Sequence, residues 1–228
     1  MSKKVILDVD TGSDDAVAIM TALGCEELDV VGICCVWGNL DVEDTTENTL
    51  RLVSALGKST PVYKGAPTAI AKYLERAVKE ELQPIYRNGK EYRIHYKRLE
   101  GLENPTDKKA ESTDAVSFYI DYLKKTKEKV TVITVGPMTN IGLALSAVPS
   151  ISENIEKLII MGGTDKLGNV SQCAEVNIWH DPEAAQIALN SGVPITFVSL
   201  DATHSAALTL NDANELKGLG TFSGKFTA

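Results

Sequence analysis

Short segments of mainly apolar, often β-branched residues alternate along the chain with longer segments whose apolar positions recur at helical spacing. The strand-like segments are residues 5–8, 30–36, 130–135, 158–161 and 195–200. The helix-like segments are residues 14–23, 43–56, 112–125, 138–147 and 182–190. Continuously apolar strands are typical of a sheet that is covered on both faces. The pattern therefore predicts an α/β fold, with a mostly parallel open sheet and helices on both faces.

Polar and glycine-containing segments follow directly after the predicted strands. Open parallel sheets bind ligands in the crevice at the carboxyl ends of their strands. We therefore expect residues 8–15, 36–39, 135–140 and 161–177 to lie along a single edge.

One segment, residues 72–109, interrupts this alternation. It contains ten basic and seven acidic residues in a chain of net charge −8, and it holds four of the seven tyrosines, Tyr73, Tyr86, Tyr92 and Tyr96. One interpretation is a solvated insertion made of a helix and a long loop. The other is a lid whose aromatic side chains reach over the active-site edge. We expect residues 1–228 to form a single domain that carries this insertion.

Composition narrows the class of protein further. A chain of 228 residues with 43% hydrophobic side chains is typical of one globular domain. Its acidic balance disfavours nucleic acid as a partner, and no apolar run approaches the roughly 20 residues of a membrane helix. Since Asp8 leaves no room for a signal-peptide core, the expected location is the cytoplasm. The four cysteines lack the spacing of a zinc site or a disulfide framework.

The most informative segment is the acidic turn, residues 8–15, which reads DVDTGSDD. Its four carboxylates, Asp8, Asp10, Asp14 and Asp15, exceed what capping of the following helix requires. Carboxylates so close together repel one another, and a bound cation relieves the repulsion. Oxygen ligands favour Ca²⁺ or Mg²⁺. The turn therefore predicts a metal site.

With these residues in view, the chain resembles the inosine–uridine-preferring nucleoside hydrolase family. The acidic turn resembles the family's DxDxGxDDA motif. Further motifs follow in the family's order, namely VWGN at 36–39, TVGPMTN at 134–140, MGG at 161–163, GN at 168–169, AEVN at 174–177, HDPEAA at 180–185 and LDATH at 200–204. The resemblance covers nearly the whole chain and implies the family's Rossmann-like fold.

The resemblance also implies an activity and a metal, because members of this family bind Ca²⁺ and hydrolyse the N-glycosidic bond of nucleosides. Asp10, Asp15 and the backbone carbonyl of Val135 would be the calcium ligands. Asp10 would also accept a proton from the calcium-bound water. Asp8 and Asn39 would complete the inner shell.

The other matched positions would surround the sugar. Asp14 and Asn177 would hold the ribose 2′- and 3′-hydroxyls, and Asn169 and Glu175 would hold the 5′-hydroxyl. Met161 would pack under the sugar. A carboxylate-lined pocket agrees with this chemistry, since the ribosyl transition state carries positive charge.

The chain departs from the family's pattern near its end. Family members have a further C-terminal His-Asp-Pro motif that supplies a calcium ligand and a histidine beside the leaving base. Residues 180–182 are also His-Asp-Pro, but their place within the 175–185 block assigns them to another element of the family's fold. We therefore expect a C-terminally truncated fold with a weakened calcium site, a frayed end at residues 218–228 and exposed apolar sheet. If inosine and p-nitrophenyl riboside were hydrolysed equally well, a leaving-group acid would have to lie within these residues, and His95 would be the first candidate.

Two alternatives stay open at this point. The first is a non-catalytic calcium- or nucleoside-binding remnant of the same fold. The second is a phosphatase of the haloacid-dehalogenase type, which also begins with DxD after a strand, although residues 12–15 do not match that family's continuation. The preference for purine or pyrimidine bases is also open. Family members are commonly dimers or tetramers, so a homo-oligomer is expected.

Overall fold

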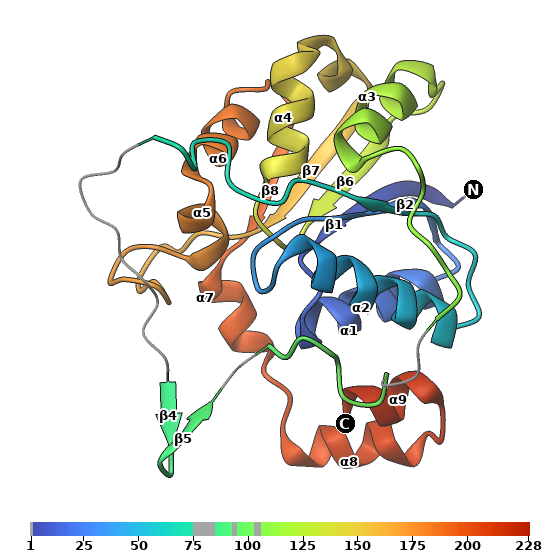
Figure 1. Ribbon diagram of the computed structural model, residues 1–228, viewed down its shortest axis with the longest axis vertical. Helices are drawn as coiled ribbons and strands as arrows, with labels where there is room; N and C mark the ends of the chain where they lie inside the picture. Colours follow the sequence, from blue (N-terminus) through green and yellow to red (C-terminus); the bar gives the residue numbers. More distant parts are fainter. Residues whose placement is uncertain (1, 75–84, 93–94, 103–105) are drawn as a thin grey trace.

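The computed structural model describes residues 2–74, 85–92, 95–102 and 106–228. Its main sheet has six strands, all parallel, in the order β3-β2-β1-β6-β7-β8 (Figure 1). The strands are β1 (Lys3–Val9), β2 (Leu28–Cys35), β3 (Val62–Lys64), β6 (Val130–Thr134), β7 (Ile155–Met161) and β8 (Ile195–Val198). The predicted α/β class is therefore confirmed.

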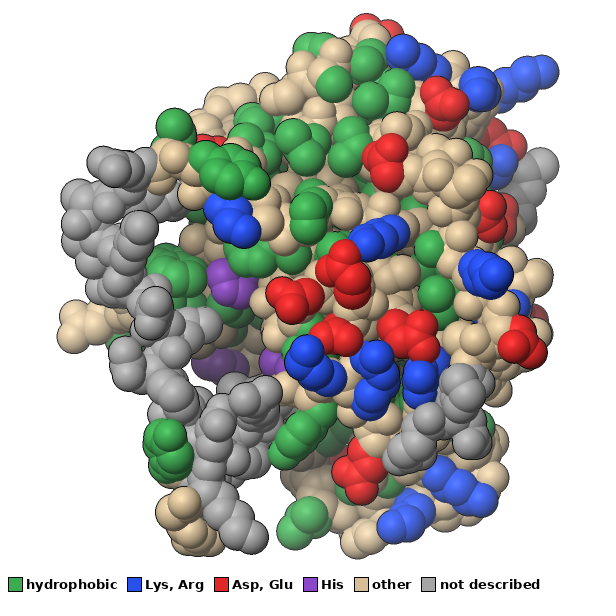
Figure 2. Space-filling view, in the orientation of Figure 1, with side chains coloured by type: hydrophobic (Ala, Val, Ile, Leu, Met, Phe, Trp, Pro, Cys, Tyr) green, Lys and Arg blue, Asp and Glu red, His purple; other side chains and the backbone are tan. Residues whose placement is uncertain are grey.

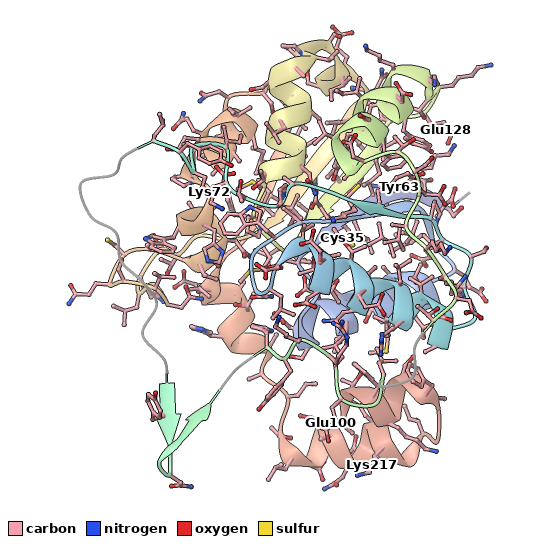
Figure 3. All side chains as sticks on the ribbon, in the orientation of Figure 1. Cys35, Tyr63, Lys72, Glu100, Glu128 and Lys217 are labelled. Atoms are coloured by element: carbon pink, nitrogen blue, oxygen red, sulfur yellow. The ribbon has the colours of Figure 1, made fainter. Side chains whose placement is uncertain are left out.

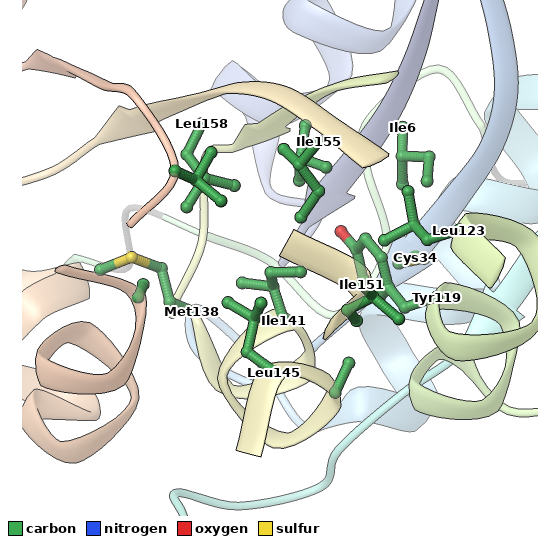
Figure 4. Close-up of a cluster of buried hydrophobic side chains, with 14 of the residues drawn as sticks. Ile6, Cys34, Tyr119, Leu123, Met138, Ile141, Leu145, Ile151, Ile155 and Leu158 are labelled. Atoms are coloured by element: carbon green, nitrogen blue, oxygen red, sulfur yellow. The ribbon is translucent and has the colours of Figure 1, made fainter. Parts of the chain in front are cut away.

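Helices cover both faces of the sheet, and each face has its own hydrophobic core. On one face pack α3 (Ala115–Lys125), α4 (Thr139–Ala147), the 3₁₀ helix Pro149–Asn154 and α6 (Pro182–Leu189). Figure 4 shows this core, in which Tyr119, Ile141 and Leu158 are fully buried. The other face is covered by α1 (Ser13–Gly24), α2 (Val42–Ala55) and α9 (Phe222–Thr227).

The topology determines where a ligand can bind. From β1 the chain first builds β2 and β3 on one side and later returns to build β6, β7 and β8 on the other. In the register, Asp8 of β1 lies between Cys34 of β2 and Thr134 of β6. The strand order thus reverses between β1 and β6, and a crevice forms where such neighbouring strands end. Asp10 and Val135 follow these two strands directly.

The end of the described chain differs from the expected frayed segment. Residues 210–227 form α8 (Leu210–Gly218) and α9. The Thr221 hydroxyl caps α9 by accepting a hydrogen bond from the Gly224 amide at 3.1 Å. Phe226 of α9 packs against the second core, which contains Leu99 and Leu102. The Gly, Ser and Thr content of the segment predicted a frayed end because it gave no sign of the cap or of the partly buried Phe226.

The described part of residues 72–109 also differs from the predicted helix and long loop. It contains a hairpin of β4 (Ile85–Arg87) and β5 (Lys90–Tyr92). Asn88 and Gly89 at its turn both have positive φ, 51° and 73°, and Asn-Gly is the strongest short-range signal for such a turn. The Asn88-Gly89 pair was thus a signal for this hairpin in the sequence. Residues 75–84, 93–94 and 103–105 lie outside the described residues.

Three of the four tyrosines of this segment have exposed side chains. Tyr73, Tyr86 and Tyr96 are 89%, 66% and 56% exposed, and the side chain of Tyr92 lies outside the described residues. Closure of the segment over a ligand stays a prediction.

Two expectations drawn from composition can be compared with the structure. All four cysteines are free thiols, as their spacing predicted. In the described part of the chain, no helix is both long enough and apolar enough to cross a membrane.

Candidate functional site

A cavity of about 700 Å³ opens at the carboxyl edge of the sheet, a size typical of small-molecule sites. Figure 2 shows histidine side chains gathered at a hollow on the corresponding side of the molecule. Eight of the residues predicted from the sequence line this cavity, namely Asp14, Asp15, Asn39, Val135, Met161, Asn169, Glu175 and Asn177. The fold therefore brings together residues from four widely separated parts of the chain.

Asp10 is buried at the carboxyl end of β1, with only 1% of its surface exposed. Its Oδ2 accepts a hydrogen bond from the Asn39 amide at 2.7 Å, whereas its Oδ1 is buried and has no hydrogen-bond partner. A side chain at either Gly38 or Gly136 would collide with this carboxylate, so both glycines are needed for its close packing. Burial, followed by the neighbouring charge of Asp15, raises the pKa of Asp10 well above its usual range.

Asp15 lies beside Asp10 in the first turn of α1. Its Oδ1 accepts from the Asp10 amide at 3.2 Å, and its Oδ2 accepts from the Gly12 amide at 3.0 Å and from Asn39 Nδ2 at 3.3 Å. Burial, followed by the charge of Asp14, raises the pKa of Asp15 to about 6. Two buried carboxylates in contact are unfavourable when both are ionised, and a cation between them would remove this cost.

The donor set at this point fits a hard cation. It consists of the unpartnered Asp10 Oδ1, the Asp15 carboxylate and the backbone carbonyl of Val135 at the cavity wall. No group of three or more His, Cys, Asp or Glu side chains within the described residues could hold a metal by itself. Calcium is commonly bound by carboxylates together with backbone carbonyls and water, which makes two carboxylates and a carbonyl a suitable start.

Asp8 lies below the cavity, within the sheet. Its carboxylate accepts hydrogen bonds from the Tyr119 hydroxyl at 2.9 Å and from Asn140 Nδ2 at 3.1 Å. Burial raises its pKa to about 7, although both hydrogen bonds oppose this change. Asp8 thus supports the floor of the site and does not line the cavity.

A polar loop before α5 (Val176–His180) forms the wall opposite the acidic turn. Asn177 Nδ2 donates to the Val135 carbonyl at 2.8 Å and to the Met161 carbonyl at 3.2 Å, and so joins the ends of β6 and β7. Glu175 is 1% exposed and caps α5, because its carboxylate accepts from the Asn177 and Ile178 amides and also from the Gly163 amide. This capping role was not apparent from the sequence.

Asn169 is also tied to the start of α5. Its Oδ1 accepts from the Val176 amide at 2.9 Å. This contact leaves the amide nitrogen of the Asn169 side chain available for a ligand.

Two of the three histidines line the cavity. His95 packs over Gly12, with its Nδ1 3.8 Å from a carboxylate oxygen of Asp14. His180, at the end of α5, was not predicted as a cavity residue, because its place in the 175–185 block indicated only that it is not the family's C-terminal His-Asp-Pro pair. Its neighbour Asp181 does have a structural role, since it is buried and caps α6 through the Ala184 amide at 3.0 Å.

The segment that carries His95 is fixed to α2. Arg98 and Lys97 form ion pairs with Asp44 at 2.9 and 3.4 Å, and Arg51 donates to the Leu102 carbonyl at 2.9 Å. The side chains of this region are drawn in Figure 3. These contacts hold His95 at the rim of the acidic turn.

A groove of about 640 Å³ lies elsewhere, between α3 and the start of β1, and its walls include Lys4, Tyr63 and Tyr122. It contains none of the residues predicted from the sequence. The carboxyl-edge cavity is therefore the candidate active site.

Comparison with known proteins gives a consistent result. A model of the family described as inosine-uridine preferring nucleoside hydrolase matches residues 5–228. The pyrimidine-specific ribonucleoside hydrolase RihB of Escherichia coli is 37% identical over 209 residues, which are 91% of this chain and 62% of that protein. The chain thus spans about three fifths of the length of this relative.

Solved structures show the same likeness. The purine-preferring ribonucleoside hydrolase from Gardnerella vaginalis superposes with a TM-score of 0.83 at 36% identity, over 99% of this chain and 69% of that one. A plant nucleoside hydrolase gives a TM-score of 0.86 at 30% identity, over 100% of this chain and 69% of that one. These matches decide against the phosphatase alternative, and the chain belongs to the inosine–uridine-preferring nucleoside hydrolase family.

Proposed function

We propose that this protein hydrolyses the N-glycosidic bond of ribonucleosides to ribose and free base, with Ca²⁺ as cofactor. The observation that carries the proposal is the Asp10 carboxylate. One of its oxygens is buried and unpartnered, and such a group calls for a cation or a proton donor. Its neighbours Asp15, Gly38 and Asn39 line the cavity. The family membership supports the same reaction.

In this proposal, Asp10 acts as the general base. A water oxygen attacks C1′ of the ribose while the bond from C1′ to the base nitrogen breaks, and the electron pair of that bond leaves with the base. Asp10 accepts the proton of the water. When bound at Asp10, Asp15 and the Val135 carbonyl, Ca²⁺ would orient the water and stabilise the ionised carboxylates.

The sugar would lie between the acidic turn and α5. Asp14 is exposed to the cavity and has an acceptor for a ribose hydroxyl. Because the Nδ2 of Asn177 is already bound to two carbonyls, its Oδ1 is the atom that would face the sugar. Asn169 and Glu175 would hold the 5′-hydroxyl, and Met161 would pack against the ring.

The calcium site can be tested by isothermal titration of the metal-free protein with Ca²⁺. We expect saturable binding to the wild type and no measurable binding to Asp10→Ala, because the variant lacks the unpartnered oxygen. Asp121→Ala is the matched control, since Asp121 is an exposed acidic residue of α3 that pairs with Lys125 outside the cavity. Equal affinities for Asp10→Ala and the wild type would contradict the assignment.

A second test concerns the ribose hydroxyls. We expect 2′-deoxyinosine to be hydrolysed about 5- to 150-fold more slowly than inosine, because an unpaired buried polar group costs about 1–3 kcal/mol. Asp14→Ala and Asn177→Ala should lose this discrimination together with most of the rate. Equal kcat/KM for the two nucleosides in the wild type would show that the site makes no hydrogen bond to the 2′-hydroxyl that contributes to catalysis.

His95 is the proposed donor of a proton to the leaving base. Burial lowers its pKa, while the charge of Asp14 opposes this change. We expect His95→Gln to lower kcat/KM for inosine by about 10²-fold or more, within the range of general acid catalysis. Hydrolysis of p-nitrophenyl riboside should change little, because nitrophenolate leaves without protonation. A parallel loss on both substrates would mean that His95 acts by positioning.

The base preference is addressed by assaying inosine and uridine side by side. RihB is named pyrimidine-specific and the Gardnerella enzyme purine-preferring, yet both are about equally similar to this chain. Calcium and ribose binding without hydrolysis of either nucleoside would favour a non-catalytic remnant.

The homo-oligomer stays a prediction, which sedimentation velocity would test.

A further inference from the structure

His180 is a cavity residue to which the proposed reaction gives no task. Its ring lies close to both tryptophans of the chain, with ring centroids 5.0 Å from Trp37 and 5.7 Å from Trp179. Its Nδ1 is buried and has no hydrogen-bond partner. Because this nitrogen is closed to solvent, a ligand would contact the part of the imidazole that lines the cavity.

The surroundings of His180 are held in place by a chain of hydrogen bonds. Trp37 Nε1 donates to the Thr139 hydroxyl at 3.2 Å, and this hydroxyl donates to Asp181 Oδ2 at 2.7 Å. The same Asp181 oxygen accepts from the Ile70 amide at 3.0 Å. Because Trp37 and Asp181 are both fixed, His180 between them belongs to a preorganised wall.

The position of His180 relative to the sugar follows from helix geometry. Asn177 and His180 are three residues apart on α5, and Val176 and His180 are four apart, so all three share one helical face. All three line the cavity. Three residues of helix advance about 4.5 Å, which is comparable to the spacing between a ribose hydroxyl and the base. A nucleoside held by Asn177 would thus present its base to Val176 and His180.

The state of the imidazole suits a polar, uncharged ligand. Burial lowers the pKa of His180, so the ring is neutral at pH 7 and has one donor and one acceptor. Nucleobases are planar and carry donors and acceptors at their edges. Aromatic neighbours such as Trp37 add a surface for stacking.

We propose that His180, supported by Trp37, contacts the nucleobase and is a specificity-determining residue of this cavity. The inference rests on the proposed function for the position of the sugar. It predicts that the site prefers leaving groups with hydrogen-bonding edges, such as hypoxanthine and uracil, over an aryl group that lacks a ring N–H.

The first test compares substrates with and without a nucleobase. His180→Phe keeps the aromatic shape and removes both ring nitrogens. We expect kcat/KM for inosine or uridine, whichever the wild type prefers, to fall about 10-fold or more, and that for p-nitrophenyl riboside to stay within about threefold. His180→Gln keeps a donor and an acceptor and should recover part of the loss. An equal change for nucleosides and p-nitrophenyl riboside would overturn the proposal.

The second test measures binding without catalysis. Since Trp37 and Trp179 both adjoin His180, the intrinsic tryptophan fluorescence of the protein reports on ligand binding at this wall of the cavity. We expect free hypoxanthine or uracil to change the fluorescence saturably in the wild type and to bind at least 10-fold more weakly to His180→Phe. His204→Phe is the control, because His204 is an exposed histidine outside the cavity.

The outcomes separate this inference from the proposed function. Unchanged base binding in His180→Phe, with a wild type that binds the base, would overturn the role of His180 alone. A wild type that neither binds ribose nor hydrolyses p-nitrophenyl riboside would overturn the proposed function. In that case the base titration still decides whether His180 contacts a base.

Discussion

Replacement of Asp10 by Asn is expected to lower kcat for inosine by about 10²- to 10⁴-fold, the usual range for removal of a general base. The amide of Asn is nearly the same size as the carboxylate and fits between Gly38 and Gly136, but it cannot accept the proton of the attacking water. It can still accept the hydrogen bond that the Asn39 amide now gives to Asp10 Oδ2. The effect should therefore fall on the chemical step, as measured by steady-state kinetics.

The control for this prediction is ribose binding, which Asp10→Asn should retain because the proposed sugar contacts lie on Asp14 and α5. Asp121→Asn serves as the matched variant, since it removes one exposed carboxylate of α3 that pairs with Lys125 outside the cavity. A turnover number for Asp10→Asn within tenfold of the wild type would exclude Asp10 as the base.

Without calcium, the protein is expected to become less stable as the pH rises from about 5 to 7. The pKa of Asp8 is about 7 in the folded state, against 3.8 for an ordinary aspartate. In this window the folded state keeps a proton that the unfolded state has lost, so stability is highest at low pH and decreases as Asp8 ionises. The decrease is about 1.4 kcal/mol per pH unit well below pH 7 and halves at pH 7, which gives roughly 2 kcal/mol between pH 5 and 7. Asp10 and Asp15 act in the same direction.

Chemical denaturation in EDTA at pH 5 and pH 7.5 would measure this effect, and added Ca²⁺ should reduce it by stabilising the ionised carboxylates of Asp10 and Asp15. Asp8→Asn removes the contribution of Asp8 and should flatten the dependence. Stability that increases with pH in EDTA would show that Asp8 is already ionised in the folded protein.

The sequence by itself determined the fold class and the edge that carries the site. Buried strands leave a clear signal because both of their faces are apolar, as in residues 30–36. Ligand-binding residues follow strand ends because only there do loops meet above a parallel sheet. For this reason the acidic turn and the segment 161–177 could be assigned to one cavity before their positions were known.

Short elements with few apolar residues were harder to predict from the sequence. The three-residue strand β3 is too short to show periodicity. The Asn-Gly turn of the hairpin and the Thr221 cap of α9 were present in the sequence, but the composition around them suggested loops. Each of these elements is stabilised by a turn, a cap or one buried side chain.

Only the tertiary structure decided how the site residues are used. The Glu175 carboxylate accepts hydrogen bonds from backbone amides at the start of α5, and Asn177 joins the ends of two strands. These contacts form because residues distant in sequence meet at the carboxyl edge of the sheet. His180 faces the cavity beside Trp37, some 140 residues away along the chain. Burial of Asp8 and Asp10 raises their pKa values, and burial depends on every element packed around the switch point. The sequence names the chemical groups, but their distances and desolvation arise only when the sheet and its helices close around them.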